Sequence, residues 1–324
     1  MRYLCRSGLR AAATAAILLA GACSPGTSDE DAVQRGDLAF AQDRYDEALA
    51  EYRLAVRQGA DDAETLARVA QTYAVLGQVD DAGSFYRDAA QRDADFTDQA
   101  VSEVMRMARD ARASGDRFAM ATAVETALEL RPGVGVGDMA LDLARHYFRS
   151  GEYGRALPFY ERAMAEATDS APDIVFEVGQ AYEEIGDCRH ALIFFERFRE
   201  MVRPWERGEV DWYIGTCAFN VARELRAEAD VGLTDEERTG RLQRALELVT
   251  RANEVGEPRN IQGQAWFTRA AVLSDLGRCE EAMNAYARVR EVDAATSLVN
   301  RAQDRFDEIR FGRGLEDMRG GRCR

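Results

Sequence analysis

The sequence predicts an all-α protein made of repeated helical hairpins, and three observations lead to this prediction. One residue pattern occurs twice between Leu143 and Arg203, with the two copies about 35 residues apart. Weaker copies in the same register occur on both sides of this stretch. Prolines fall between the predicted repeats, where a helix has to stop, and these are Pro132, Pro172, Pro204 and Pro258.

The spacing within the pattern has a physical reason in a helical hairpin. A small residue such as Gly179 on the first helix lets the second helix approach closely, and Ala156 or Ala191 on the second helix fills the matching contact. Gly151 and Gly186 stand where the chain reverses, because glycine adopts a positive φ at little cost. One hairpin cannot bury its apolar side alone, so neighbouring hairpins have to stack.

The pattern resembles the tetratricopeptide repeat (TPR). The resemblance implies a right-handed superhelical solenoid of helix hairpins that ends in a C-terminal capping helix. The residues that carry it are Ala144, Tyr147, Gly151, Tyr153, Ala156, Tyr160 and Ala163 in one copy, and Gly179, Tyr182, Gly186, Cys188, Ala191, Phe195 and Phe198 in the other.

Taken in order, the predicted solenoid covers residues 32–311 with about seven repeats. The third repeat is degraded, because Ala111, Met120 and Val124 replace the usual aromatic, alanine and aromatic residues. The sixth has an insertion near 226–240, in which Thr234 precedes three acids as a helix N-cap should. The repeats are expected at about 36–60, 63–96, 101–134, 137–204 (two repeats), 208–255 and 263–296, before a capping helix at 297–311 and a polar tail at 312–324.

Residues 1–22 have the features of an export signal: an arginine-containing start and then an apolar run too short to span a membrane as a helix. The run ends in LLAGAC at Cys23, which is similar to the lipobox of bacterial lipoproteins and predicts lipidation of Cys23. The stretch Ala20-Gly21-Ala22 also suits an ordinary secretion peptidase, so simple secretion stays open. Residues 23–31 read as a flexible tether.

The net charge disfavours one class of partner, and the cysteines suggest disulfide bonds. The formal net charge is −15, which disfavours general nucleic-acid binding. An exported chain meets an oxidising compartment, where disulfides form. Cys188 opens the second helix of the fifth repeat and Cys217 lies on the helix predicted to pack there, so we expect a Cys188–Cys217 disulfide. Cys279 and Cys323 could pair likewise, and free thiols are the alternative.

No catalytic constellation is found in the sequence. The two histidines, His146 and His190, lie inside repeats without the spacing of metal ligands. The glycine-rich run at residues 133–137 follows a helix rather than a strand, which fits a repeat junction better than a phosphate loop. We therefore expect no enzyme activity, no metal and no cofactor.

The resemblance places the first helix of each repeat on an inner surface that binds peptides. At these inner positions we expect a peptide-binding site for an extended or helical segment with acidic and apolar residues. The lysine and asparagine set that binds C-terminal acidic tails in this family is not matched. The predicted site consists of Arg109, Arg112, Arg145, Phe148, Arg149, Phe176, Gln180, Trp212 and Phe219. The competing hypothesis is that the arginines pair with Glu177, Glu183 and Glu184, and that the aromatic residues pack between helices.

The sequence thus predicts a lipid-anchored scaffold for protein–protein interaction at the cell envelope, on the periplasmic face of the outer membrane. The membrane contact would be the lipid anchor alone, and no nucleic acid is expected as a partner. One alternative is an outer-membrane assembly protein similar to the TPR subunit of the β-barrel insertion machine. Another is a protein that binds or cleaves cell-wall glycans.

Overall fold

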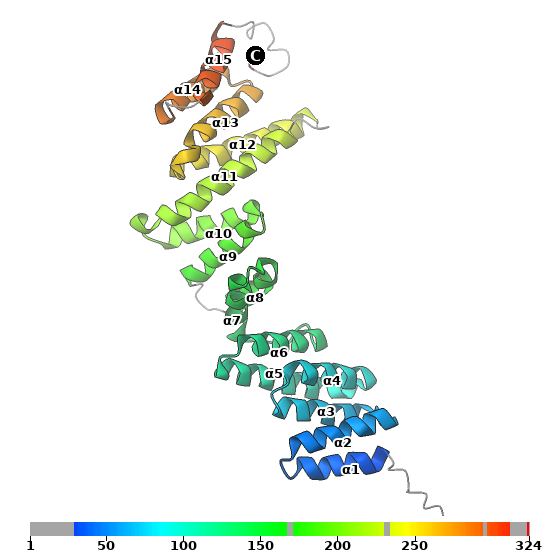
Figure 1. The fold of residues 1–324 in the computed structure, drawn as a ribbon. Coiled ribbons are helices and arrows are strands. Elements are labelled where there is room, and N and C mark those ends of the chain that lie inside the picture. Colours follow the sequence, from blue (N-terminus) through cyan, green and yellow to red (C-terminus); the bar gives the residue numbers. More distant parts are fainter. Residues whose placement is uncertain (1–28, 167–170, 230–233, 294–296, 312–322, 324) are drawn as a thin grey trace, which may run out of the picture. The chain divides into compact units, whose positions relative to one another are not determined.

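The computed structural model describes residues 29–166, 171–229, 234–293, 297–311 and Cys323 (Figure 1). Within these residues the regular structure is entirely helical, as predicted. The chain divides into two compact units, Met1–Val134 and Gly135–Arg324. In the described part of the chain, consecutive α-helices pair into seven antiparallel hairpins, which we number one to seven in chain order.

The first unit contains hairpins one to three. Its helices are α1 (Asp29–Phe40), α2 (Tyr45–Gln58), α3 (Ala63–Val75), α4 (Val79–Arg92), α5 (Thr97–Ser114) and α6 (Arg117–Leu130). The alanine-rich and methionine-rich core of hairpin three shows that the degraded repeat still folds as a hairpin. Met120 and Val124 are both buried where the stronger repeats have alanine and an aromatic residue.

The second unit contains hairpins four to seven and a final helix. Its helices are α7 (Met139–Arg149), α8 (Tyr153–Glu166), α9 (Pro172–Glu184), α10 (Cys188–Met201), α11 (Gly208–Glu228), α12 (Asp235–Val255), α13 (Gln262–Asp275), α14 (Cys279–Val292) and α15 (Ser297–Phe311). Helix α15 packs on α14 and also contacts α13, which is the arrangement expected of a capping helix. The right-handed superhelix remains a prediction.

Hairpins one and five close through a glycine against an aromatic ring. A Cβ atom on Gly179 would lie 2.6 Å from the ring of Phe195, and one on Gly36 would lie 2.5 Å from the ring of Tyr52. In both hairpins the aromatic residue follows the glycine by sixteen positions (195 − 179 and 52 − 36). Gly186 has a φ of 80° in the turn between the two helices, as its predicted role requires.

Hairpin six is the longest, at the place where the sequence predicts an insertion near 226–240. The described residues of that segment are mostly helical, and α11 and α12 have 21 residues each. Thr234 accepts a hydrogen bond from the backbone N–H of Glu237, whose side chain accepts one in return from the backbone N–H of Thr234. This capping box starts α12 before the acids of its first turn, which confirms the predicted N-cap.

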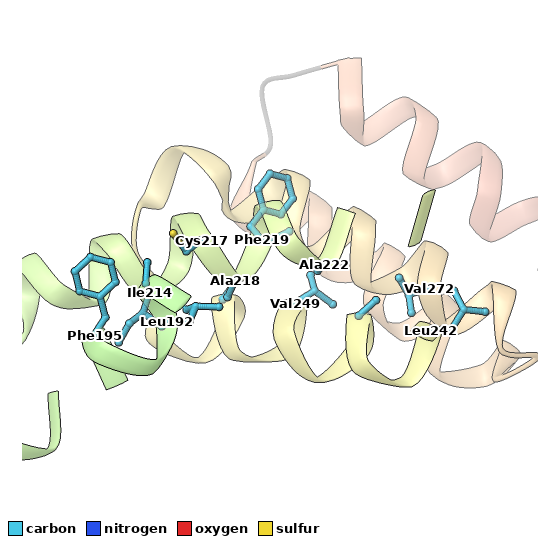
Figure 2. Packing of buried hydrophobic residues seen from close by; sticks show 14 of the residues in the cluster. Leu192, Phe195, Ile214, Cys217, Ala218, Phe219, Ala222, Leu242, Val249 and Val272 are labelled. Carbon is cyan, nitrogen blue, oxygen red and sulfur yellow. The ribbon is translucent and has the colours of Figure 1, made fainter. Parts of the chain in front are cut away.

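A continuous apolar core runs through α10, α11, α12 and α13 (Figure 2). Leu192 and Phe195 from α10 face Ile214 and Ala218 of α11, and Leu242 and Val249 continue the core from α12. Because the same side chains touch two hairpins, the hairpins of this unit cannot fold as isolated pieces.

Two disulfides tie this unit together. Cys188 of α10 bonds to Cys217 of α11, with a distance of 5.0 Å between their Cα atoms, and this is the pairing predicted from the sequence. Cys279 of α14 bonds to Cys323 near the chain end, with 5.5 Å between Cα atoms. Cys188 and Cys279 hold the same place in their hairpins, two residues after the turn glycine.

The N-terminal prediction is corrected in one detail. Helix α1 begins at Asp29, so the last three residues of the expected tether are helical. Three acids at a helix start are favoured by the helix dipole, which explains why a polar segment joins the helix. Cys23 and the predicted export signal lie outside the described residues. No helix among the described residues is long and apolar enough to cross a membrane.

Candidate functional site

The first helices of hairpins four to seven lie side by side. Arg145 of α7 contacts α9, Gln180 of α9 donates a hydrogen bond to Tyr213 of α11 at 3.1 Å, and Arg226 of α11 pairs with Asp275 of α13 at 2.8 Å. We call the surface formed by α7, α9, α11 and α13 the first-helix face. It belongs to the second unit, and its helices carry all the predicted peptide-binding residues except Arg109 and Arg112.

Arg145 is engaged within the protein. Its Nε lies 2.9 Å from Glu177 and its Nη2 lies 2.7 Å from Asp173, both on α9. The hydrogen bond to Glu177 raises the pKa of the Arg145 guanidinium above its ordinary value. Tyr160 also donates a hydrogen bond to Glu177 at 2.9 Å. A peptide carboxylate could bind Arg145 only by displacing these two carboxylates. The geometry at Arg145 thus agrees with the competing hypothesis, in which the arginines pair with acids of the next repeat.

The four arginines predicted to form one cluster lie in different units. Arg109 and Arg112 are exposed on α5 of the first unit, whereas Arg145 and the exposed Arg149 are on α7 of the second. Arg109 and Arg112 share helix α5, and Arg145 and Arg149 share helix α7. A joint cluster of all four remains a prediction.

Most of the predicted aromatic anchors contribute to packing between helices. Phe148 is half-buried against the rings of Tyr153 and Tyr160. Phe176 is half-buried and lies 4.7 Å, centroid to centroid, from the ring of Phe198. Trp212 retains 45% exposure and is the one predicted aromatic anchor that solvent reaches freely.

The prediction that Phe219 is an exposed anchor is wrong. Its side chain is only 4% exposed, because it packs into the core with Ala222 and Ala265 (Figure 2). The guanidinium of Arg223, one helical turn later on α11, lies 5.5 Å above the ring. The register of the repeat could not show this, because the ring is covered by α13 of the following hairpin.

Two hollows open on the first-helix face at hairpin seven, beside the capping helix. One has a volume of about 540 Å³ and the other of about 440 Å³. Phe267 and Arg301 line both of them. The larger is also lined by Arg226, Ala271, Ser274, Asp275, Tyr286, Asp304, Arg305, Glu308, Ile309 and Cys323, and the smaller by Phe219, Arg223, Gln264, Thr268, Asp293, Ser297 and Leu298.

Arg223 and Arg301 are the unusual groups of these hollows. Arg301 of α15 lies 5.0 Å above the ring of Phe267, just as Arg223 lies above Phe219. Within the described part of the chain, neither guanidinium makes a hydrogen bond or an ion pair. An arginine whose guanidinium lies over an aromatic ring can still direct N–H groups at a carboxylate.

Most of the other charged side chains that line the hollows form ion pairs. Arg226 pairs with Asp275 at 2.8 Å and Arg305 pairs with Glu308 at 2.6 Å. Asp304 also lines the larger hollow, so that hollow carries both signs of charge. The smaller hollow also contains one acid, Asp293, but it has two arginines without a hydrogen bond or ion pair among the described residues, Arg223 and Arg301, next to the rings of Phe219 and Phe267.

The histidines do not build a reactive centre with their neighbours. His190 Nδ1 lies 2.6 Å from Asp187, which also caps the start of α10, while His146 is half-buried against the ring of Tyr147. The described residues contain no group of three or more His, Cys, Asp or Glu arranged to hold a metal ion.

Burial, and next the adjacent Glu184, raise the pKa of the half-buried Glu183.

The glycine–aromatic contact recurs at the same spacing in hairpins one and five, and the first helices of successive hairpins pack side by side. These are the features that the sequence resemblance implied. The described residues therefore have the all-α hairpin-repeat fold that the resemblance predicted. No protein-family model matches the chain, and no curated protein matches it.

Several solved TPR structures are similar to this chain. The C-terminal part of a TPR repeat-containing protein from Cytophaga hutchinsonii is 14% identical, with 83% of this chain and 98% of that chain covered and a TM-score of 0.33. YrrB, a TPR protein with an unusual peptide-binding site, is 15% identical over 78% of this chain and 97% of that chain, with a TM-score of 0.31. The TPR2AB domain of yeast Sti1 in a complex with pHSP90 is 15% identical over 86% and 96%, with a TM-score of 0.30. Because these identities and TM-scores are low, the similar structures carry no information about the ligands of this chain.

Sequence reasoning missed Arg223 and Arg301. One signal was present, because Phe219 and Arg223 stand four residues apart on one helix and so share a face. Arg301 could not be placed in advance, since its role depends on how the capping helix docks on α13.

Proposed function

We propose that this protein is an exported, lipid-anchored TPR scaffold of the cell envelope. It binds a peptide segment that carries acidic and apolar residues, and the binding site is the first-helix face of the second unit. The observation that carries the proposal is the smaller hollow at hairpin seven. There Arg223 and Arg301 lie over aromatic rings and have no partner among the described residues.

The chemistry of the hollow favours a carboxylate next to an apolar side chain. A guanidinium binds a carboxylate through two parallel hydrogen bonds, and such charge-assisted bonds are stronger than neutral ones. Phe267, at the boundary of both hollows, offers an apolar surface for a neighbouring side chain. The protein elsewhere is acidic, with a net charge of −15, so an acidic peptide is repelled from most of the surface and selected here.

The test compares two double variants with the same change of charge. Arg223→Gln with Arg301→Gln changes the hollow, whereas Arg53→Gln with Arg57→Gln changes two exposed arginines on α2 of the first unit. The probe is a fluorescein-labelled peptide that alternates Glu with Phe and Leu, and a matched peptide has Lys in place of Glu. Fluorescence anisotropy measures the dissociation constant.

The hollow variant is expected to bind the acidic peptide about tenfold more weakly than wild type, since two charge-assisted contacts are lost. The α2 variant should bind like wild type, and the lysine peptide should bind poorly to all three proteins. Equal loss in both variants, or equal binding of both peptides, would show that the hollow is not the site. Circular dichroism confirms that each variant is folded.

The proposed location at the cell envelope is argued from residues outside the peptide site. The lipobox-like ending at Cys23 supports lipidation, and the four cysteines beyond it stand in two disulfides, which suits an oxidising compartment. Cys23→Ser is expected to move the protein from the membrane fraction to the soluble fraction, because acyl chains would be its anchor. Wild-type protein that is already soluble and carries an unmodified N-terminus would contradict lipidation.

A further inference from the structure

Cys323 occupies one side of the larger hollow. Its disulfide to Cys279 fixes it there, and its side chain is 9% exposed. Its backbone N–H donates a hydrogen bond to the carbonyl oxygen of Ser274 at 2.9 Å. Ser274 lies in the last turn of α13, on the first-helix face, and lines the same hollow.

This contact has the form of a bound peptide. A main-chain N–H from outside the hairpin meets a helix carbonyl in the larger hollow, which Phe267 and Arg301 also line and which they connect to the smaller one. A residue that is tied to the site by a covalent bond competes with a free ligand at high effective concentration. Cys323 is therefore placed to compete with a peptide that enters from the smaller hollow.

We propose that the Cys279–Cys323 disulfide is a redox latch that keeps the end of the peptide site occupied by the chain's own Cys323. This inference rests on the proposed function, since it concerns the same site. While the bond is intact, Cys323 forms one wall of the larger hollow and donates to the Ser274 carbonyl, which also accepts from the Gly277 N–H at 3.1 Å. When the bond is reduced, Cys323 is free to leave, and the second acceptor position of the Ser274 carbonyl becomes available to a peptide N–H.

The opening step is thiol–disulfide exchange with a dithiol reductant. One thiolate of the dithiol attacks a sulfur of the Cys279–Cys323 bond, which gives a mixed disulfide and releases the other cysteine as a thiolate. The second thiol of the reductant then closes on the mixed disulfide and releases the remaining cysteine. Two electrons and two protons pass to Cys279 and Cys323, and the dithiol leaves as a cyclic disulfide.

The chain offers a matched control in its other disulfide. Cys188 and Cys279 hold equivalent places in their hairpins, but Cys217 lies in the buried core and not in either hollow. We compare the full-length Cys279→Ser, Cys323→Ser variant with the full-length Cys188→Ser, Cys217→Ser variant. The second is measured both oxidised and after treatment with dithiothreitol, which then acts on the Cys279–Cys323 bond.

Two probes separate this inference from the proposed function. The first is 8-anilinonaphthalene-1-sulfonate, an anionic aromatic dye that suits a hollow with Phe267 and Arg301 whatever the natural ligand is. The second is the fluorescein-labelled Glu/Phe/Leu peptide. Release of Cys323 is expected to raise the dye fluorescence and to raise the peptide affinity about fivefold or more. Arg301→Gln in the same background should remove the gain in dye fluorescence.

The outcomes are distinct. If neither the Cys279→Ser, Cys323→Ser variant nor dithiothreitol treatment raises dye fluorescence, the latch is refuted, whatever the peptide does. If dye fluorescence rises but no protein binds the peptide, the latch stands and the proposed peptide site fails. If the serine variant proves unfolded by circular dichroism, the reduction and reoxidation of the Cys188→Ser, Cys217→Ser variant decides, and a reversible change in dye binding is then required.

Discussion

Replacing Gly179 by alanine should destabilise the second unit, although alanine is the better helix former. The Cβ atom would lie 2.6 Å from Cε1 and 2.7 Å from Cδ1 of Phe195. Ordinary van der Waals contact begins at 3.4 Å, so the ring or the helix has to move by about 0.8 Å (3.4 − 2.6). Phe195 is fully buried and stacks on Tyr213, with 4.8 Å between ring centroids, so it has no free space to enter.

Two opposing effects set the magnitude. Overpacking of a filled core costs about 1–3 kcal/mol. Alanine in the middle of a helix recovers about 0.5–1 kcal/mol relative to glycine. The net loss of unfolding free energy is therefore about 0–2.5 kcal/mol.

Urea unfolding followed by tryptophan fluorescence measures this loss, because Trp205, Trp212 and Trp266 all lie in the second unit. The matched control is Gly240→Ala on α12, where an added Cβ meets no atom within 4 Å. That variant should be stabilised by about 0.5–1 kcal/mol. If Gly179→Ala is as stable as Gly240→Ala, the close approach of α9 and α10 is not what fixes glycine at this position.

Two further predictions concern the same unit. Thr234→Ala removes the capping box of α12 and should lower the unfolding free energy by about 1 kcal/mol, measured by the urea midpoint; an unchanged midpoint would mean that α12 does not depend on its cap. Burial, and next the charge of Glu184, raise the pKa of Glu183 in the folded protein. The folded protein therefore keeps the Glu183 carboxyl protonated to a higher pH than the unfolded chain does, and the unfolding free energy falls as the pH rises through the folded pKa. Glu183→Gln should therefore raise the urea midpoint at neutral pH but not at a pH well below the ordinary glutamate value, and a variant less stable than wild type at neutral pH would contradict this sign.

The hairpins could be predicted because their signals are local. Gly186 in the turn, together with Gly179 and Phe195 on facing helices, specifies a hairpin from residues that are close in the chain. The N-cap at Thr234 in the insertion of hairpin six could be predicted for the same reason. The sequence did not show how far the described residues of the insertion extend α11.

The site was less predictable because it depends on contacts between hairpins. The repeat register places Arg145 and Phe219 on the inner surface, but it does not show which neighbours cover them. Arg145 meets two carboxylates of the next hairpin, and Phe219 is covered by α13 and Arg223. The Cys188–Cys217 pairing could be proposed because one cysteine starts a helix that packs directly on the helix of the other.

The two disulfides also give the chain a mechanical asymmetry. A disulfide removes the enclosed segment from the length that tension can extend, and the sequence separations are 29 for Cys188–Cys217 and 44 for Cys279–Cys323. At roughly 3.5 Å per residue, the two bonds hide about 100 Å and about 150 Å of contour length. Residues 29–134 contain no cysteine, so the first unit has no such restraint. If the chain is anchored at Cys23 and pulled through a ligand on hairpin seven, the first unit can extend over its whole length, whereas residues 188–217 of the second unit cannot extend.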